Sequence, residues 1–461
     1  MKAATNELLR RISQKNPDIT LQQVFDLILG IPQNLAPISV IEKLFEQDYY
    51  PGTFIISERK TLPDFLPEKD RLPYEDWVKS IVEEHLEQIK SIPNLSSDIR
   101  KQINVVSKEQ IAEWTLDVLE DTHPCGLKLS EMIWNQEFDD IFRRIEAGFI
   151  VGNPEFDFDV YASLKCAGKK ISFWILNELK KLCLPITNLI TISALSGLMG
   201  LNYKTYASAA SPINSENIIP ISLSPTEDEC KSILTLLLNR SHQSPTIDDR
   251  SLFINFISSQ NSYKSIAFIL DDYIESLFDL SLAENILKAN PNVSISIIPR
   301  WGLCGNDMSY QECVKLLNLP FYWYSSELYN CYPPRLHIIA NGPRLGGFNG
   351  RKISTTVAQA LINSDILYVK GARNYEMMQG IKKNTYYSFT VCREISEIVT
   401  GIPASSGAPV FIYQPSGKKT FQGFWHKNKR EKGTSSRYCL NQITAKEFVK
   451  SRKTGDKNGN Q

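Results

Sequence analysis

From Ser265 onward, apolar runs of strand length alternate with helical patterns, and this alternation limits the chain to few folds. Helical patterns at 274–290 and 353–363 lie between the runs. Repeated strand–helix units with apolar strands predict a parallel sheet covered by helices, a three-layer α/β/α arrangement of the Rossmann-like type. The runs that predict strands are SIAFIL at 265–270, VSISII at 293–298, RLHIIAN at 335–341, DILYVKG at 365–371 and APVFIYQ at 408–414.

The part of the chain before this alternation has a different pattern. Segments 21–31, 75–92 and 107–121 place apolar residues three and four positions apart, which predicts helices. The next hundred residues combine helical patterns with loop-like stretches, and they could cap an active site. We therefore predict a mainly helical region at 1–150, a connecting region at 151–260, an α/β core at 261–425 and a basic tail at 426–461.

The composition makes several classes of protein improbable. The 461 residues are 42% hydrophobic and 22% charged with zero net charge, so no overall charge favours nucleic acid. The tail from Lys427 carries ten basic and three acidic residues, which is typical of a solvated, poorly ordered segment. No apolar stretch reaches the roughly 18 residues of a membrane span. The nine cysteines form no C-x-x-C pair, so free thiols in a reducing cytoplasm are expected.

Polar side chains follow the predicted strands at the sheet edge where parallel α/β proteins bind ligands. This position predicts that the core binds metal and phosphate at one edge. In chain order the candidates are Asp271, Asp272 and Glu275 after the first strand, Asp307 after the second, Gly342 and Gly346 in a glycine-rich loop after the third, and Lys370 and Asn374 at and after the fourth.

Adjacent carboxylates repel each other unless a cation lies between them, and hard oxygen ligands suit one divalent ion such as Mg²⁺ or Mn²⁺. A metal, a lysine and backbone N–H groups at one sheet edge are the groups that phosphoryl chemistry needs. Other interpretations stay open for each residue. One aspartate of the pair could cap the following helix, Asp307 could cap the next one, and Lys370 could pair with Asp365 at the surface.

Taken together, these residues resemble the motifs of the metal-dependent damage-control phosphatases. This family was catalogued as a domain of unknown function, and one member was described as an acidic-residue methyltransferase. Asp271, Asp272 and Glu275 occupy the Asp, Asn and Glu places of its first motif, and Asn306-Asp307 resembles its second. The run from Asp365 through Lys370-Gly371 to Asn374-Tyr375-Glu376 resembles its lysine motif, and the loop Asn341-Gly342…Gly346 is similar to its Ser/Thr-Gly…Gly loop. The resemblance extends over about 262–415.

The resemblance implies a role for each matched residue. Asp271, Asp272 and Asp307 would bind one divalent ion (Mn²⁺, Co²⁺, Ni²⁺ or Mg²⁺), and Asp271 and Glu275 would serve catalysis, with Glu275 orienting or deprotonating the attacking water. Lys370, Asn374 and the Gly342–Gly346 backbone would hold the phosphate of a small metabolite. The turn GFIVGNPEFDFD resembles an upstream turn of the family, which makes Asn153 and Asp157 candidate substrate contacts.

The sequence also departs from the family pattern. Asp272 stands where the family has asparagine, Tyr273-Ile274 replaces Ala-Gly, and Ala372 replaces a polar residue. We expect a metal-dependent phosphatase of a small phosphorylated metabolite. The alternatives are an S-adenosylmethionine-dependent carboxyl methyltransferase and a catalytically inactive relative that binds a metabolite or a partner. The acidic loop after the first strand argues against the methyltransferase, because that class uses a glycine-rich loop there.

Overall fold

The computed structural model describes most of the chain. The described residues are 2–32, 34–45, 74–90, 97–121, 138–154, 159, 161–199, 219, 221–260, 262–317, 334–341, 347–392, 400–403, 406–417, 419–421 and 438–440.

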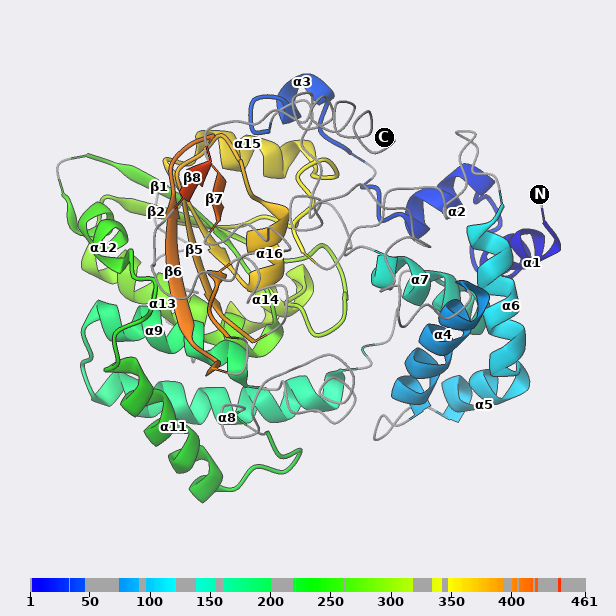
Figure 1. Ribbon diagram of the computed structural model, residues 1–461, viewed down its shortest axis with the longest axis horizontal. Helices are drawn as coiled ribbons and strands as arrows, with labels where there is room; N and C mark the ends of the chain where they lie inside the picture. The colour runs from blue at the N-terminus through cyan, green and yellow to red at the C-terminus, as the bar shows by residue number, and fades with distance from the viewer. Residues whose placement is uncertain are drawn as a thin grey trace, which may run out of the picture.

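A six-stranded sheet forms the centre of the α/β core (Figure 1). The strands lie in the order β3-β2-β1-β4-β5-β6, and the first five are parallel while β6 is antiparallel to β5. A separate antiparallel pair joins β7 to β8. The strand bounds are β1 Lys264–Ile269, β2 Val293–Ile298, β3 Leu336–Ile338, β4 Ile366–Lys370, β5 Thr385–Thr390, β6 Pro409–Gln414, β7 Lys419–Phe421 and β8 Tyr438–Leu440.

The strands are apolar on both faces, and successive side chains enter two different cores. In β1, Ile266 and Phe268 belong to one buried cluster, while Ala267 and Ile269 belong to another. This alternation is the period of two that a strand imposes, and burial on both sides explains why the runs are continuously apolar. The sheet is therefore the middle layer of three, as the sequence predicts.

Helices cover both faces of the sheet. On one face, α13 packs on β2 and α9 packs on β5 and β6. These two helices contact each other, α8 also contacts α13, and most residues of α13 are buried. The other face carries α15 and the short α3, which contact each other. The bounds of the helices in this part are α3 Ile38–Ile41, α8 Ala162–Lys181, α9 Ile186–Leu195, the 3₁₀ helix η4 Ser196–Leu198, α11 Glu227–Ser241, α12 Arg250–Ser258, α13 Tyr273–Ala289, α14 Tyr310–Leu317, α15 Thr355–Asn363 and α16 Ala372–Met377.

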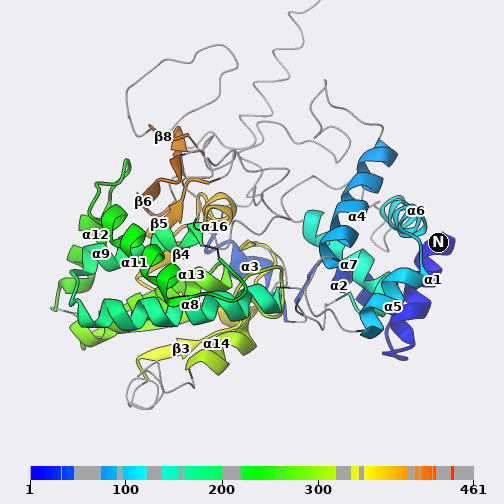
Figure 2. The ribbon, with the colours of Figure 1, turned by 90° about the horizontal axis from the view of Figure 1, so that it is seen from below.

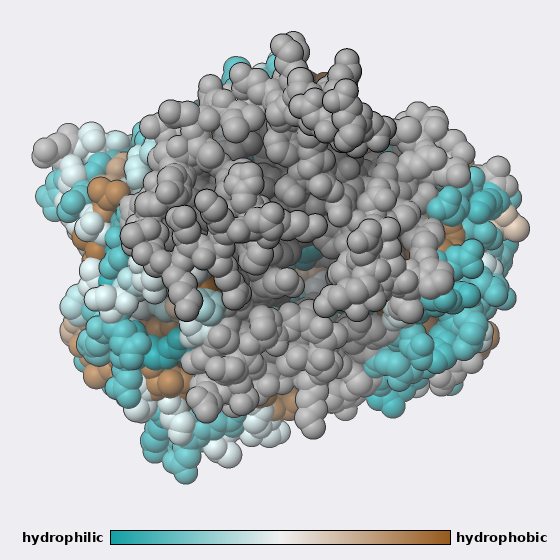
Figure 3. Space-filling model, in the orientation of Figure 1, coloured by the Kyte–Doolittle hydropathy of each residue, from teal (hydrophilic) through white to brown (hydrophobic). Residues whose placement is uncertain are grey.

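The N-terminal helices form a group with its own apolar core, beside the sheet in both ribbon views (Figures 1 and 2). Hydrophilic residues cover much of its surface in the orientation of Figure 1, as Figure 3 shows on the right. Thr20 and Gln23 form a capping box at the start of α2, which explains where that helix begins. The bounds are α1 Ala3–Ser13, α2 Leu21–Ile28, α4 Tyr74–Lys90, α5 Ser97–Val105, α6 Lys108–Leu119 and α7 Phe138–Val151.

The fold class is confirmed, with two differences in detail. The sequence reasoning missed β5, whose run is TYYSFT, and it included the last strand in a parallel sheet, whereas β6 is antiparallel to β5. The four predicted domain ranges stay predictions. Within the predicted tail, Tyr438–Leu440 forms β8, and most of the remaining tail lies outside the described residues. In the described part of the chain, none of the helices has the length and apolar character needed to cross a membrane.

Candidate metal centre

The strand–helix junction β1–α13 presents the two adjacent aspartates. β1 ends at Ile269, Leu270 is buried, and Asp271 and Asp272 lie at the carboxyl edge of the sheet before α13 begins. Asp272 occupies the N-cap position of α13, yet its side chain makes no capping hydrogen bond. The interpretation of a simple helix cap is therefore not supported at Asp272.

Backbone hydrogen bonds hold the loop after β2 against this junction. The N–H of Met308 donates to the carbonyl of Asp271 at 2.9 Å, and the N–H of Tyr273 donates to Asn306 at 2.7 Å. Asp272 and Asp307 thus face each other in an isolated antiparallel bridge. Within the described residues, Asp271, Asp272 and Asp307 bring carboxylate oxygens within 4.8 Å of one another.

Asp307 does not cap the next helix, because Ser309 occupies that position. The hydroxyl of Ser309 accepts from the N–H of Glu312 at 3.3 Å, and Glu312 in turn accepts from the N–H of Ser309 at 2.9 Å. This reciprocal pair is a capping box at the start of α14. The alternative that Asp307 caps that helix is therefore wrong.

A buried arginine lies between two of the aspartates. Arg300 follows β2 and is 1% exposed. Its Nε is 2.7 Å from Oδ2 of Asp307, and its Nη2 is 3.1 Å from Oδ1 of Asp271. Sequence reasoning missed Arg300, although a charged residue directly after an apolar strand, in the dipeptide Pro299-Arg300, was the available signal.

Asn374 and Gly371 complete the surroundings of Asp271. The side-chain amide of Asn374 accepts from Arg300 at 3.1 Å and lies 3.4 Å from Oδ1 of Asp271. Gly371 has a φ of +84°, and a Cβ there would stand 1.7 Å from Oδ2 of Asp271. Only glycine fits this position, because both the backbone conformation and the carboxylate exclude a side chain.

The aspartate cluster suits a divalent cation. Three carboxylates and the guanidinium of Arg300 carry a net charge of −2, which one divalent ion would balance. All the candidate donors are carboxylate oxygens, which are the ligands that Mg²⁺ and Mn²⁺ prefer. Asp271 and Asp272 are partly exposed, so an ion could reach them from solvent.

A second polar cluster is buried beside the first. Lys370, which ends β4, is fully buried, and its Nζ donates to the carbonyl of Ser193 at 2.7 Å. The same ammonium lies 3.3 Å from Glu275 and 3.4 Å from Asp279, two residues one helical turn apart on α13. Asp365 instead accepts from the N–H of Ser265 at 2.7 Å, so the predicted alternative of a surface pair with Lys370 is wrong.

Burial determines the ionisation of this second cluster. It raises the pKa of Glu275 to about 8 and that of Asp279 to about 6, although the ammonium of Lys370 opposes both shifts. Burial also disfavours the charged form of Lys370, but Asp279 and Glu275 outweigh it and raise its pKa. Both carboxylates therefore hold a proton more readily than an exposed carboxylate does, and they share the single ammonium of Lys370.

A third group of charged residues links α8 to the loop that carries Asp307. Lys165 is buried, and its ammonium lies 3.1 Å from Asp159 and 3.0 Å from Glu312. It also donates to the backbone carbonyl of Asp307 at 3.3 Å. Lys165 thus ties the connecting region to the loop that carries Asp307, a contact for which the helical pattern of α8 gave no signal.

The structure brings together some of the sequence-predicted residues. Asp271, Asp272, Asp307 and Asn374 meet at one edge of the sheet, while Glu275 and Lys370 form the neighbouring buried cluster. Asn153 lies two residues beyond the end of α7. Asp157, Gly342 and Gly346 lie outside the described residues, and the functional roles of the whole set stay predictions.

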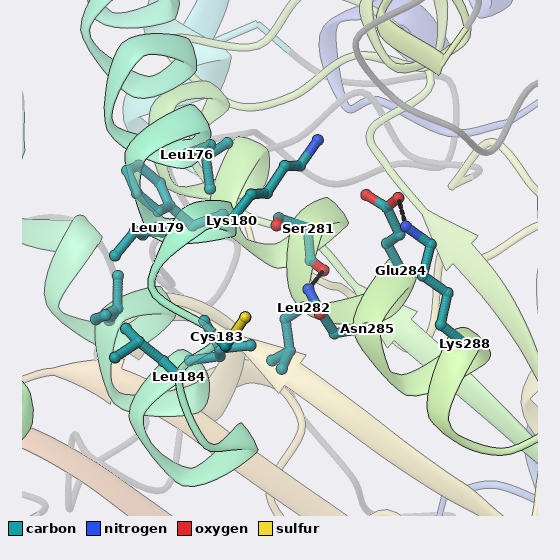
Figure 4. A pocket seen from close by; sticks show the side chains of 13 residues that line it. Leu176, Leu179, Lys180, Cys183, Leu184, Ser281, Leu282, Glu284, Asn285 and Lys288 are labelled. Carbon is teal, nitrogen blue, oxygen red and sulfur yellow. Dashed lines mark hydrogen bonds and ion pairs between the residues drawn. The ribbon is translucent and has the colours of Figure 1, made fainter.

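A cavity of about 260 Å³ lies elsewhere, between α8, α9 and α13 (Figure 4). Its wall combines apolar side chains with polar and charged ones, and Glu284 and Lys288 form an ion pair in it. None of the predicted site residues lines this cavity, so it is separate from the aspartate cluster.

The doubly covered sheet and the aspartates at its carboxyl edge define an α/β protein with a candidate metal centre. The family model described as "Damage-control phosphatase ARMT1-like domain" matches residues 78–405, and the chain belongs to this family. Among solved structures, the chain is similar to a DUF89 family protein from Pyrococcus horikoshii at 14% identity and a TM-score of 0.49, over 73% of this chain and 97% of that one. No curated protein matches the chain.

Proposed function

We propose that this protein is a metal-dependent phosphatase that hydrolyses a small phosphorylated metabolite. The observation that carries the proposal is the convergence of Asp271, Asp272 and Asp307 at the carboxyl edge of the sheet, with carboxylate oxygens within 4.8 Å of one another. Membership of the damage-control phosphatase family supports the same reaction class. A bound divalent ion would polarise the phosphoryl group and favour attack by water.

The residues around the cluster would prepare it for this chemistry. Arg300 and Asn374 orient the carboxylate of Asp271 through Oδ1. Glu275 is the candidate for orienting or deprotonating the attacking water. With a pKa of about 8 it carries a proton at neutral pH, so acting as a base would require loss of that proton as the site loads. Lys370, at 3.3 Å, is the group that would stabilise the resulting carboxylate.

Substrate contacts complete the proposal. Lys370 would hold the phosphate by exchanging the carbonyl of Ser193 for a phosphoryl oxygen. The backbone at Gly342 and Gly346 would assist it, and Asn153 and Asp157 would contact the rest of the metabolite. We also propose a cytoplasmic location, since Cys166, Cys183, Cys230, Cys304, Cys313 and Cys392 are free thiols.

The test is a panel of phosphate monoesters, assayed with Mn²⁺, Co²⁺, Ni²⁺ and Mg²⁺ in turn. We expect turnover that depends on the metal, that stops in excess chelator and that is lost in Asp271→Ala. Asp365→Ala is the matched control, because Asp365 lies at the opposite end of the β1–β4 pair, where it binds Ser265. Turnover by Asp271→Ala, or by the wild type in chelator, would contradict the proposal.

The purified wild-type protein can also be used to distinguish the phosphatase from the two alternative functions. A rise in melting temperature with S-adenosylmethionine but not with metal would favour a carboxyl methyltransferase. Metal binding without turnover across the panel would favour an inactive relative that binds a metabolite or a partner.

A further inference from the structure

Arg300 occupies an unusual position for a charged side chain. It is 1% exposed, and it is among the largest fully buried side chains of the described residues. A guanidinium cannot lose its charge in a protein, so its burial is tolerated only where acceptors surround it. The acceptors here include two of the three aspartates of the candidate metal centre.

The backbone fixes Arg300 relative to the loop that carries Asp307. The N–H of Arg300 donates to the carbonyl of Met308 at 2.9 Å, and the carbonyl of Arg300 accepts from the N–H of Tyr310 at 2.7 Å. These two bonds enclose Asp307 and its neighbours in a closed turn. The backbone of Arg300 is therefore fixed relative to Asp307.

From this main chain the planar guanidinium reaches three oxygens. Nε donates to Oδ2 of Asp307 at 2.7 Å, while Nη2 donates at 3.1 Å both to Oδ1 of Asp271 and to Oδ1 of Asn374. The nitrogens of a guanidinium keep a fixed geometry, so the orientation of one carboxylate is coupled to that of the other. A lysine ammonium is a point charge on a flexible stem and has no such geometry.

A second arginine, Arg335, has hydrogen-bond partners of a different kind from those of Arg300. Arg335, just before β3, donates only to backbone carbonyls in its described contacts, at Val293, Leu287 and Asn290, which is typical of a structural arginine. The Nη1 of Arg300 is buried without a hydrogen-bond partner in the described structure. The contacts of Arg300 with two carboxylate side chains therefore distinguish it from Arg335.

We propose that Arg300 is a positioning residue that sets the relative orientation of Asp271 and Asp307 and thereby the metal affinity of the centre. This inference rests on the proposed metal site, and it adds a residue that contacts the ligands rather than the ion. Hydrogen-bonding partners of metal ligands orient those ligands, and their loss lowers metal affinity about 10- to 100-fold in comparable sites.

The test measures metal binding directly, by titrating full-length protein with Mn²⁺ and following free Mn²⁺ by electron paramagnetic resonance. Arg300→Lys keeps the positive charge and removes the fixed geometry, and we expect its Kd for Mn²⁺ to rise about 10- to 100-fold. Arg335→Lys is the matched control, because it makes the same exchange at a backbone-binding arginine, and we expect its Kd to equal that of the wild type. Circular dichroism confirms that each variant is folded.

A Kd for folded Arg300→Lys equal to or lower than that of the wild type would overturn the inference. Should Arg300→Lys fail to fold, Arg300→Gln is the second variant, and weaker binding is again expected. Tighter binding by Arg300→Gln would mean that the arginine only competes with the metal charge, which contradicts a positioning role. Because binding is measured without substrate, an inactive wild type that binds Mn²⁺ would count against the phosphatase proposal and not against Arg300.

Discussion

The ammonium of Lys370 lies 3.3 Å from Oε2 of Glu275, and both groups are buried at the end of β4 and the start of α13. Asp279 is 3.4 Å from the same ammonium, so a single cation serves two carboxylates. The protonation state of Glu275 is therefore coupled to the stability of the fold.

Stability should fall with rising pH because of Glu275. Burial raises its pKa from 4.5 to about 8, so the folded state holds a proton that the unfolded state releases above its own pKa. This stabilisation is fully present below about pH 4.5 and is lost as pH rises to about 8. Urea unfolding at pH 5, 7 and 9 measures it, and Glu275→Gln should flatten the profile. Parallel profiles for wild type and variant would contradict the assignment.

Lys165 should stabilise both the fold and the loop that carries Asp307. Lys165→Met leaves Asp159 and Glu312 without their shared cation and removes a donor from the carbonyl of Asp307. Breaking a buried ion pair in this way costs about 3 kcal/mol of unfolding free energy. Chemical denaturation measures the loss, and Lys231→Met, which breaks an exposed pair with Glu227, should have little effect. Equal losses in the two variants would show that the burial of Lys165 is unimportant.

The sequence predicted the sheet better than it predicted the site. Apolar runs located β1 and β4, because strands buried on both faces are mostly apolar along their length, and alternating apolar residues located β2. The parallel order then implied that Asp271 and Asp307 share one edge, and the structure places them there. The run TYYSFT of β5 gives a weaker signal, because half of its residues are not apolar or are only partly so, although the strand is fully buried.

The partners of the charged residues could not be predicted in the same way. Lys370 was expected at the edge, but its side chain turns inward to Ser193 on α9, 177 residues earlier in the chain. The role of Arg300 depends on Asp271 and Asn374, which approach it only when β1, β2 and β4 lie side by side in the sheet. The local pattern of apolar residues identifies helices and strands. The contacts of Lys370 and Arg300 depend instead on how elements far apart in the sequence pack together.

Gly371→Ala should damage the metal centre more than its backbone strain explains. The new Cβ would stand 1.7 Å from Oδ2 of Asp271, so the carboxylate must move. Gly417→Ala is the matched control, because Gly417 has a similar φ of +70° with nothing within 4 Å of the added Cβ. Both variants should lose about 1 kcal/mol or more of stability from the positive φ. Only Gly371→Ala should also lose Mn²⁺ binding, and equal Mn²⁺ affinities in the two variants would contradict the site.

Asp272→Asn tests the position where this chain differs from the family pattern. The carboxylate of Asp272 adds a charge to the cluster, so an amide should weaken Mn²⁺ binding while the other two aspartates keep some of it. One unit charge at about 4 Å is worth about 1 kcal/mol in water and more near a protein surface, which predicts a Kd at least about 5-fold higher. Asp365→Asn makes the same charge change where the carboxylate binds Ser265, and its Mn²⁺ affinity should stay at the wild-type value. If Asp272→Asn bound Mn²⁺ as tightly as the wild type, Asp272 would not be a ligand, and its carboxylate would have to face solvent beside an ion held by Asp271 and Asp307.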